Sequence, residues 1–282
     1  AGYKGADRRV KLFKSDDFEG KRSLNNVGVA HNLETHNQDI IDYIVHDLNF
    51  GASEGMFSAR YPSEGCYITN LNNAVAQGEL VIPDTYNGYT VIGIDGLTRD
   101  LDMSGGQTYH TGVTSVKIPS TVKYIGDYAF YGMSNLQSVT YAGQNNIEEI
   151  GYFAFGNCTS LTNFEVGSKV SFIGEAAFSG CDNLTSFNLQ SGNSDYLCND
   201  GVLFTKDGLA LTAFPAGRGG LFIVPNSVKL IAAGAFYDND KLTSVNLNQA
   251  DSASDYAFAD CTNLSEITAP NLQSVGIGAF EN

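Results

Sequence analysis

The feature that most constrains this chain is a six-residue motif, Ile-Gly-x-x-Ala-Phe, which recurs in its second half. The Ala-Phe pairs follow one another at intervals of 25, 23, 58, 22 and 22 residues. A fixed period in the low twenties is the mark of a solenoid, in which each repeat covers the apolar face of its neighbour. The motif therefore predicts a repeat array. The six copies, of which the last two are weaker, are Ile125–Phe130, Ile150–Phe155, Ile173–Phe178, Ile231–Phe236, Ala253–Phe258 and Val275–Phe280.

Each repeat reads as a coil of three segments. The first is a short strand such as Ser186–Leu189, whose alternating polar and apolar residues point every second side chain inward. The second is another extended piece, such as Val122–Ile125, and the third is a helical or 3₁₀ turn that carries the Ala-Phe pair. One coil alone buries too little to offset its ordering entropy, whereas a stack of coils can. In this stack Phe178 is expected to be a central residue with neighbours on both sides.

The cysteines fit the same periodicity. Cys158, Cys181 and Cys261 each lie three residues after a repeat Phe, and are expected to form one interior ladder of reduced thiols. Cys66 and Cys198 lie off this ladder and are also interpreted as structural thiols. No two cysteines have the C-x-x-C spacing of a zinc site, and no cofactor is expected.

The charge of the chain excludes one class of partner. The formal net charge is −15, and residues 61–282 carry eight Lys and Arg against 22 Asp and Glu. Such a surface repels phosphate backbones, so nucleic acid is not an expected partner. No run of about 18 apolar residues occurs, so no transmembrane segment is expected.

The stretch from Ile118 to Val139 follows the pattern Ile-Pro-x-x-Val-x-x-Ile-Gly-x-x-Ala-Phe-x-x-Met-x-x-Leu-x-x-Val. It resembles the BspA-like leucine-rich repeat proteins, which are best known from bacterial surfaces. The resemblance covers residues 66–282 and implies a leucine-rich-repeat solenoid. This is a right-handed coil with a parallel β-sheet on the concave face and short strands, 3₁₀ or helical turns elsewhere. It also implies an adhesion-type role and an extracellular or cell-surface location.

Two insertions interrupt the repeats, and a segment without repeats precedes them. A polar insertion spans residues 98–112, and a hairpin signalled by Asp-Gly pairs spans about 190–220. Residues 1–65 form a non-repeat N-terminal segment, in which one helix between Thr35 and Gly51 is expected to cap the first coil. The chain ends directly after a repeat Phe, and we expect either a shortened array or an end that another element covers.

The outward-facing strand positions are the candidate binding surface. They are polar except at Leu221 and Ile223, which lie beside the hairpin, and an apolar spot on a polar surface can mark a binding site. The alternative, slightly favoured here, is that the hairpin folds back and buries this pair. The candidate residues are Lys117, Asn163, Glu165, Asn188, Leu221, Ile223 and Asn246.

The sequence contains no strong catalytic or metal-binding motif. Asp100, Asp102 and Ser104 match the start of a calcium loop, but its twelfth position is Thr111 rather than the required Glu, so an ordinary polar insertion is the better interpretation. Neither a phosphate-binding loop nor a G-x-S-x-G or H-E-x-x-H motif occurs. The chain is therefore not expected to be an enzyme.

These observations favour one function and leave alternatives open. The first hypothesis is a non-catalytic interaction or adhesion module, on a cell surface or secreted, that binds protein or glycan through the solenoid. The second is a structural subunit that packs against other chains of a larger extracellular assembly. A hydrolase with its site in residues 1–65 is the least favoured, because that segment carries no catalytic motif.

Overall fold

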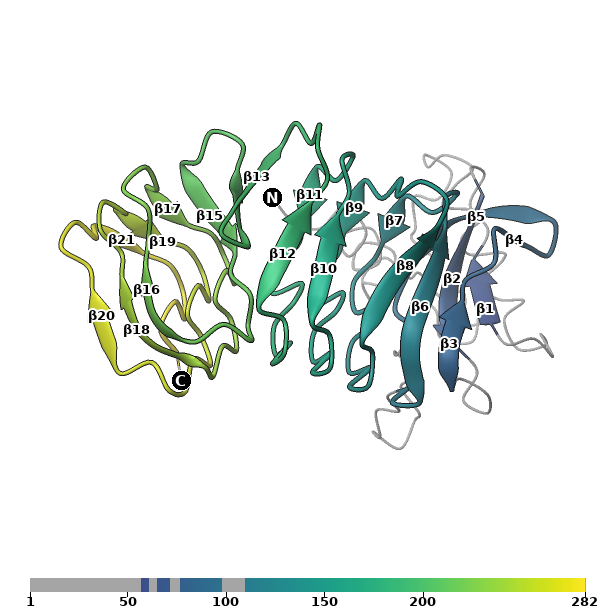
Figure 1. Cartoon of the computed structure of the whole chain (residues 1–282), viewed down its shortest axis with the longest axis horizontal. Coiled ribbons are helices and arrows are strands. Elements are labelled where there is room, and N and C mark those ends of the chain that lie inside the picture. Colours follow the sequence, from purple (N-terminus) through teal and green to yellow (C-terminus); the bar gives the residue numbers. More distant parts are fainter. Residues whose placement is uncertain (1–56, 61–64, 72–76, 98–109, 282) are drawn as a thin grey trace, which may run out of the picture.

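The computed structural model describes residues 57–60, 65–71, 77–97 and 110–281. Over these residues the chain forms a parallel β-solenoid, whose coils stack side by side along the long axis of the molecule (Figure 1). The predicted solenoid is thereby confirmed. The described residues form strands and turns without a helix. The helix expected between Thr35 and Gly51 lies outside the described residues.

The first strands of the coils stack in register. Val116 lies opposite Val139, Phe164 opposite Phe187, and Val245 opposite Ile267. We call the outward side of these strands the strand face. The strands form three separate sheets: β3 (Gly78–Val81), β6 (Val113–Pro119) and β8 (Ser138–Ala142); β10 (Asn163–Val166) and β12 (Ser186–Leu189); and β16 (Gly220–Ile223), β18 (Leu242–Asn246) and β20 (Glu266–Thr268).

The second extended pieces form two further sheets. The first contains β1 (Phe57–Arg60), β2 (Cys66–Leu71), β4 (Thr85–Tyr86), β5 (Tyr89–Ile94), β7 (Tyr124–Ile125), β9 (Glu149–Ile150) and β11 (Phe172–Ile173). The second contains β13 (Tyr196–Asn199), β14 (Val202–Thr205), β15 (Ala210–Ala213), β17 (Leu230–Ile231), β19 (Ser252–Ala253) and β21 (Ser274–Val275). β1 pairs with β2 in antiparallel fashion and is the edge strand of the first of these sheets.

The hairpin expected in the long interval between repeats is present. β13 and β14 pair in antiparallel fashion across Asp200 and Gly201, which both have positive φ (50° and 74°). Positive φ at both central residues defines the type I′ turn, whose twist matches that of the two strands. The tip of the hairpin lies against β12, where the amide of Phe187 donates to the carbonyl of Gly201 at 2.9 Å. This hairpin separates the sheet of β12 from that of β16.

The Ala-Phe segment is not helical, and this expectation was wrong. In the first complete repeat the amide of Ala129 donates to Gly126, and that of Met133 donates to Phe130. The third residue of each of these two turns, Tyr128 and Gly132, has positive φ, as in a type II turn. The same pair of positive-φ positions recurs in the later coils, and two such residues per segment are incompatible with a right-handed helix. The second pair is Phe153 and Asn157, the third Ala176 and Gly180, the fourth Gly234 and Asp238, and the fifth Tyr256 and Asp260.

The repeat Phe rings form two columns instead of one. Phe130, Phe155 and Phe178 stack with centroid distances of 5.1 and 5.3 Å. A second column contains Phe214, Phe236, Phe258 and Phe280, at 4.6, 4.6 and 5.2 Å. The buried residues likewise divide into two clusters, one on each side of the hairpin. We call the junction between the coils of Phe178 and Phe214 the seam. Phe178 thus ends the first column of stacked rings, although it also packs against Phe164 at 4.8 Å and Phe187 at 5.0 Å.

The predicted cysteine ladder is confirmed. Cys158, Cys181 and Cys261 are fully buried, and all five cysteines are free thiols. Each ladder thiol donates to the carbonyl of the repeat Phe in the preceding coil, at 3.2, 3.1 and 3.0 Å respectively. In another coil Asn239 takes this position, and its side-chain amide donates to the carbonyl of Pro215 at 3.3 Å. Each of these four coils is therefore linked to the previous one at this point.

Burial of these thiols should make them unreactive in the folded protein. It raises the pKa of Cys261 from 9.0 to about 12, which lowers its reactive thiolate fraction near pH 8 by about a thousandfold. Burial also raises the pKa of Cys158 and Cys181. We expect Cys158, Cys181 and Cys261 to react with a disulfide reagent only at the rate of unfolding, and half-buried Cys198 to react faster. Mass spectrometry of the labelled native protein measures this, and rapid labelling of all three would remove them from the core.

Candidate functional site

The structure places all seven candidate residues on strands of the strand face, but in three groups. Because β8 and β10 do not pair with each other, and because the hairpin separates β12 from β16, the groups do not form one continuous ladder. Within a sheet the positions are level across neighbouring strands, so Glu165 lies opposite Asn188 and Ile223 opposite Asn246. The groups are Lys117 on β6; Asn163, Glu165 and Asn188 on β10 and β12; and Leu221, Ile223 and Asn246 on β16 and β18.

The apolar pair at β16 is open to solvent. Leu221 is 63% exposed and Ile223 is 55% exposed, whereas Phe222 between them points inward and packs on the core. The favoured expectation that the hairpin buries this pair was therefore wrong. Leu221 lies opposite Ser244 on the neighbouring strand, so the pair borders a polar surface.

The hairpin does not cover Leu221 and Ile223 because its tip is held on the other side of the seam. Arg218, just before β16, forms an ion pair with Asp200 of the hairpin tip. Its guanidinium also lies 5.7 Å from the ring centre of Phe214 and 5.6 Å from that of Phe222. A Cβ on Gly201 would lie 2.6 Å from the Cβ of Ser186, so only a glycine allows the tip to approach β12 this closely. The tip therefore fills the gap beside β12 and leaves β16 uncovered.

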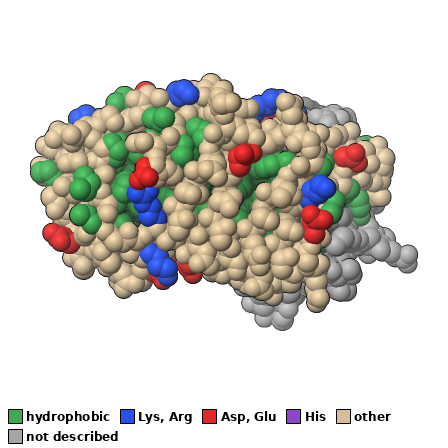
Figure 2. All heavy atoms as spheres, in the orientation of Figure 1, with side chains coloured by type: hydrophobic (Ala, Val, Ile, Leu, Met, Phe, Trp, Pro, Cys, Tyr) green, Lys and Arg blue, Asp and Glu red, His purple; other side chains and the backbone are tan. Residues whose placement is uncertain are grey.

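The polar residues of the strand face are held by local hydrogen bonds. Glu165 accepts a bond of 2.6 Å from the side-chain amide of Gln190 in the next coil. The side chain of Asn246 accepts a bond of 2.9 Å from the backbone amide of Asn248. Figure 2, which views the molecule from the side of these strands, shows charged side chains of both signs scattered among uncharged ones on this face. The outward strand positions carry both signs of charge, at Glu79, Lys117, Glu165 and Glu266, among uncharged polar residues.

A second surface, formed by the Ala-Phe turns, was not predicted from the sequence. We call it the turn face. Five half-buried aromatic side chains on it form a continuous chain of contacts from coil to coil: Tyr128, Tyr131, Tyr152, Phe153 and Tyr237. The sequence signal was available, since aromatic residues recur one to three positions from the repeat Phe. The contacts are Tyr128–Tyr131 at 5.5 Å, Tyr128–Phe153 at 5.6 Å, Tyr152–Phe153 at 4.4 Å and Phe153–Tyr237 at 5.4 Å.

Carboxylates gather beside this aromatic cluster at the seam. Burial, followed by the negative charges of Asp260, Asp182 and Asp240, raises the pKa of Asp238 to about 6. Burial and a hydrogen bond to Asp260 raise the pKa of Tyr237. Both shifts have the direction expected where negative charges outnumber positive ones.

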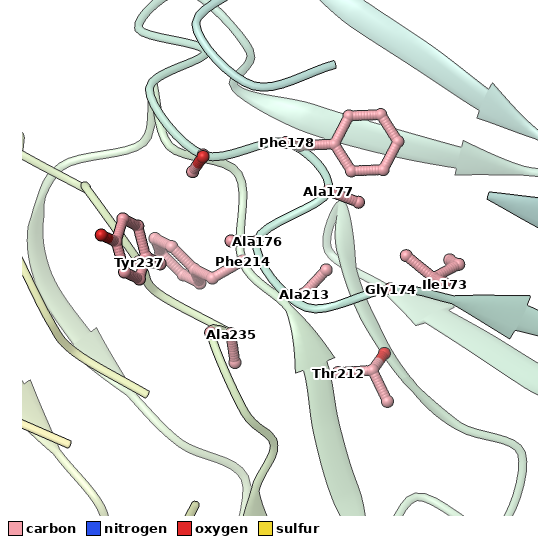
Figure 3. A pocket seen from close by; sticks show the side chains of 12 residues that line it. Ile173, Gly174, Ala176, Ala177, Phe178, Thr212, Ala213, Phe214, Ala235 and Tyr237 are labelled. Carbon is pink, nitrogen blue, oxygen red and sulfur yellow. The ribbon is translucent and has the colours of Figure 1, made fainter. Parts of the chain in front are cut away.

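A shallow hollow opens on the turn face at the seam. Its volume, solvent included, is about 280 Å³. Figure 3 shows Phe214 and Tyr237 on one side of it, with Phe178 directed away on the other. Small side chains such as Ala176 and Ala213 line the space between them. The hydroxyl oxygen of Thr212, which also lines it, is buried without a hydrogen-bond partner.

The calcium-loop candidate, Asp100, Asp102 and Ser104, lies outside the described residues. Within the residues that the structure describes, three or more His, Cys, Asp or Glu side chains nowhere come together as metal ligands would. The same part of the chain contains no helix of the length and apolarity needed to cross a membrane.

The fold is shared with solved bacterial proteins. The pneumococcal vaccine antigen PcpA is 18% identical, with a TM-score of 0.53, over 80% of this chain and 77% of that chain. A leucine-rich repeat protein from Eubacterium ventriosum is 22% identical, with a TM-score of 0.56, over 80% of this chain and 67% of that chain. At this level of identity the similarity shows the fold alone. No curated protein matches the chain.

The repeats themselves match a family model. The model for the BspA type leucine-rich repeat region matches six copies, in residues 107–199 and 221–282. These ranges include the complete repeats around Phe130, Phe155, Phe178, Phe236 and Phe258, and they exclude most of the hairpin. Since more than half of its residues are matched, the chain belongs to the BspA-type leucine-rich repeat family.

Proposed function

We propose that this chain is a non-catalytic interaction module, on a cell surface or secreted, that binds a protein or a glycan through the strand face. The observation that carries the proposal is the exposed apolar pair, Leu221 and Ile223, whose neighbours on the adjoining strand are polar. Covering two aliphatic side chains of this size is worth about 1.5–3 kcal/mol each when burial is complete. Such anchors, surrounded by polar groups that hydrogen-bond to the partner, are typical of binding sites.

The surrounding side chains suit recognition better than chemistry. Asn163, Asn188 and Glu165 are exposed amide and carboxylate groups that can donate to or accept from a partner. The thiols do not suit nucleophilic catalysis, because burial raises rather than lowers the pKa of Cys66, Cys158, Cys181, Cys198 and Cys261. A module that presents a rigid array of such groups fits the binding role.

The surface location is supported by the family and by the neighbour in fold. The solved structure from the pneumococcus is described as a vaccine antigen. An antigen of that kind must be accessible to antibodies outside the cell. The same location for this chain agrees with a long face of exposed, short polar side chains.

Binding through the strand face predicts the effect of a double substitution. Replacing Leu221 and Ile223 together by aspartate should weaken binding about tenfold or more, because the apolar contact is lost and two charges must be desolvated. The measurement is binding of the labelled protein to printed arrays of glycans and of extracellular proteins. Thermal unfolding of the variant shows whether the fold is retained.

The matched control is Val81→Asp. Val81 is 51% exposed and occupies an outward position of β3, in register with Lys117, in another sheet of the strand face. The substitution Val81→Asp also replaces an exposed aliphatic side chain by aspartate, but away from the apolar pair. It should therefore leave array binding unchanged. If both variants bind as the unmodified chain does, and changes at Asn163, Glu165, Asn188 and Asn246 also have no effect, the strand face is not the binding site.

A further inference from the structure

We propose that the turn face at the seam is a second binding surface, which holds an arginine side chain of a partner protein between the rings of Phe153 and Tyr237 and the carboxylate of Asp238. This site is distinct from the strand face and is built from different segments of each coil. Three independent features support it: the rings, a convergence of oxygen acceptors, and uncompensated negative charge.

The aromatic cluster presents π faces across the seam. Phe153 and Tyr237 belong to coils separated by that of Phe178 and by the hairpin, yet their ring centres are 5.4 Å apart at an interplanar angle of 85°. The turn between them carries the small side chain of Ala176 at the position of Phe153, and one face of Phe153 stacks on Tyr128. Both rings are half-buried, and their exposed parts can accept a cation over the face.

Oxygen acceptors converge beside these rings, over Gly180. A Cβ on Gly180 would lie 2.2 Å from Oδ1 of Asn157 and 2.7 Å from Oδ2 of Asp238. The side-chain nitrogen of Asn157 is directed elsewhere, to the hydroxyl of Tyr131 at 2.8 Å. The Asp238 carboxylate receives no hydrogen bond from the residues that the structure describes. A guanidinium, with five N–H donors in one plane, can satisfy both acceptors together.

The charge around this point is negative and largely uncompensated. Asp182, Asp240 and Asp260 all act on Asp238, and Lys241 is paired with Asp240 at 3.0 Å. Burial, followed by this repulsion, raises the pKa of Asp238 to about 6. A partner cation would relieve the repulsion, whereas an acidic or phosphate-bearing partner would increase it. Charge complementarity therefore selects a basic segment of a protein.

The chain already holds one arginine by the same combination of groups. The guanidinium of Arg218 lies within 5.7 Å of the ring centre of Phe214, and it also pairs with the carboxylate of Asp200. Two aromatic rings, the carboxylate of Asp200 and its backbone carbonyl thus surround this arginine at the seam. The turn face offers the same kinds of group, two aromatic rings and a carboxylate, and the arginine would come from the partner.

The test uses a fluorescein-labelled peptide of alternating arginine and glycine, and its counterpart with neutral citrulline in place of arginine. Fluorescence anisotropy should show binding of the arginine peptide to the whole chain, at least about tenfold tighter than that of the citrulline peptide. Asp238→Asn and Phe153→Ala should each weaken it by about fivefold or more. Both variants suit the backbone, because Asn157 and Ala176 occupy the equivalent positions with similar positive φ.

The controls separate this site from general charge and from the strand face. Glu79→Gln makes the same change of charge on β3 and should alter the affinity by less than about twofold. The Leu221→Asp, Ile223→Asp variant should bind the peptide normally. Affinity for the arginine peptide should fall as the pH drops below about 6, because Asp238 then binds a proton and loses its negative charge. Asp182, Asp240 and Asp260 are the other carboxylates that act on Asp238. Equal binding of the citrulline peptide, or equal losses in Glu79→Gln and Asp238→Asn, would overturn the proposal.

Discussion

Replacing Phe155 by alanine is expected to lower the free energy of unfolding by about 3–5 kcal/mol. Phe155 is fully buried in the middle of the first aromatic column, between Phe130 and Phe178, and also contacts Phe164 at 4.8 Å. The substitution removes ring contacts on three sides, and rigid coils above and below cannot close the resulting cavity. Urea denaturation, followed by circular dichroism, measures the loss.

The variant for comparison is Phe280→Ala, at the C-terminal end of the second column. Phe280 is only partly buried and stacks on a single ring, that of Phe258, at 5.2 Å. Its loss should therefore cost about 1–2 kcal/mol, since less apolar surface returns to water and solvent can occupy the space. Equal losses in the two variants would contradict the description of the core as stacked columns.

A single added methyl group at Gly151 should be almost as damaging. A Cβ there would lie 2.4 Å from the carbonyl carbon of Gly126, 2.5 Å from its oxygen and 2.6 Å from the amide nitrogen of Asp127. These are backbone atoms of the preceding coil, so no rotation of a side chain can relieve the overlap. The coils must separate, which also strains the 2.7 Å hydrogen bond from Gly151 to Ile125. We expect Gly151→Ala to cost about 3 kcal/mol.

The control for this substitution is Gly88→Ala. Gly88 has a φ of +85°, and no atom would lie within 4 Å of an added Cβ. Only the strain of the left-handed backbone conformation remains, which is worth about 1 kcal/mol. The same denaturation experiment compares the two. A loss at Gly151 no larger than that at Gly88 would show that the coils are less tightly stacked than the structure indicates.

Most of the fold could be predicted because the repeat carries its own packing rule. The positions of Phe155, Cys158 and Leu161 recur in later coils, and a residue type that returns at a fixed interval must meet its own copy in a stack. The Asp200–Gly201 pair likewise specified a hairpin, because few residues other than glycine and asparagine or aspartate accept positive φ at both positions. These predictions needed no information about distant contacts.

The turn conformation and the binding surfaces could not be derived in this way. The motif around Ala129 and Phe130 has a helix-like length, but the backbone amides bond alternately within the turn and to the next coil. Tyr128, Phe153 and Tyr256 accept positive φ because those bonds between coils hold them there, which local preference does not indicate. The exposure of Leu221 depends in the same way on where the hairpin tip docks.

The sequence by itself determined the repeat, its register and the ladder of buried Phe and Cys residues, since these follow from periodicity and from the burial of apolar side chains. Only the tertiary structure decided where the array divides. The tip at Gly201 docks on Ser186, Arg218 is held between Phe214 and Phe222, and the aromatic column breaks after Phe178. Each of these contacts joins residues from different coils around an insertion that has no counterpart in the repeat. Which of these contacts form depends on how the side chains fit together at the seam. The same fit places Phe153, Tyr237 and Asp238 on one surface.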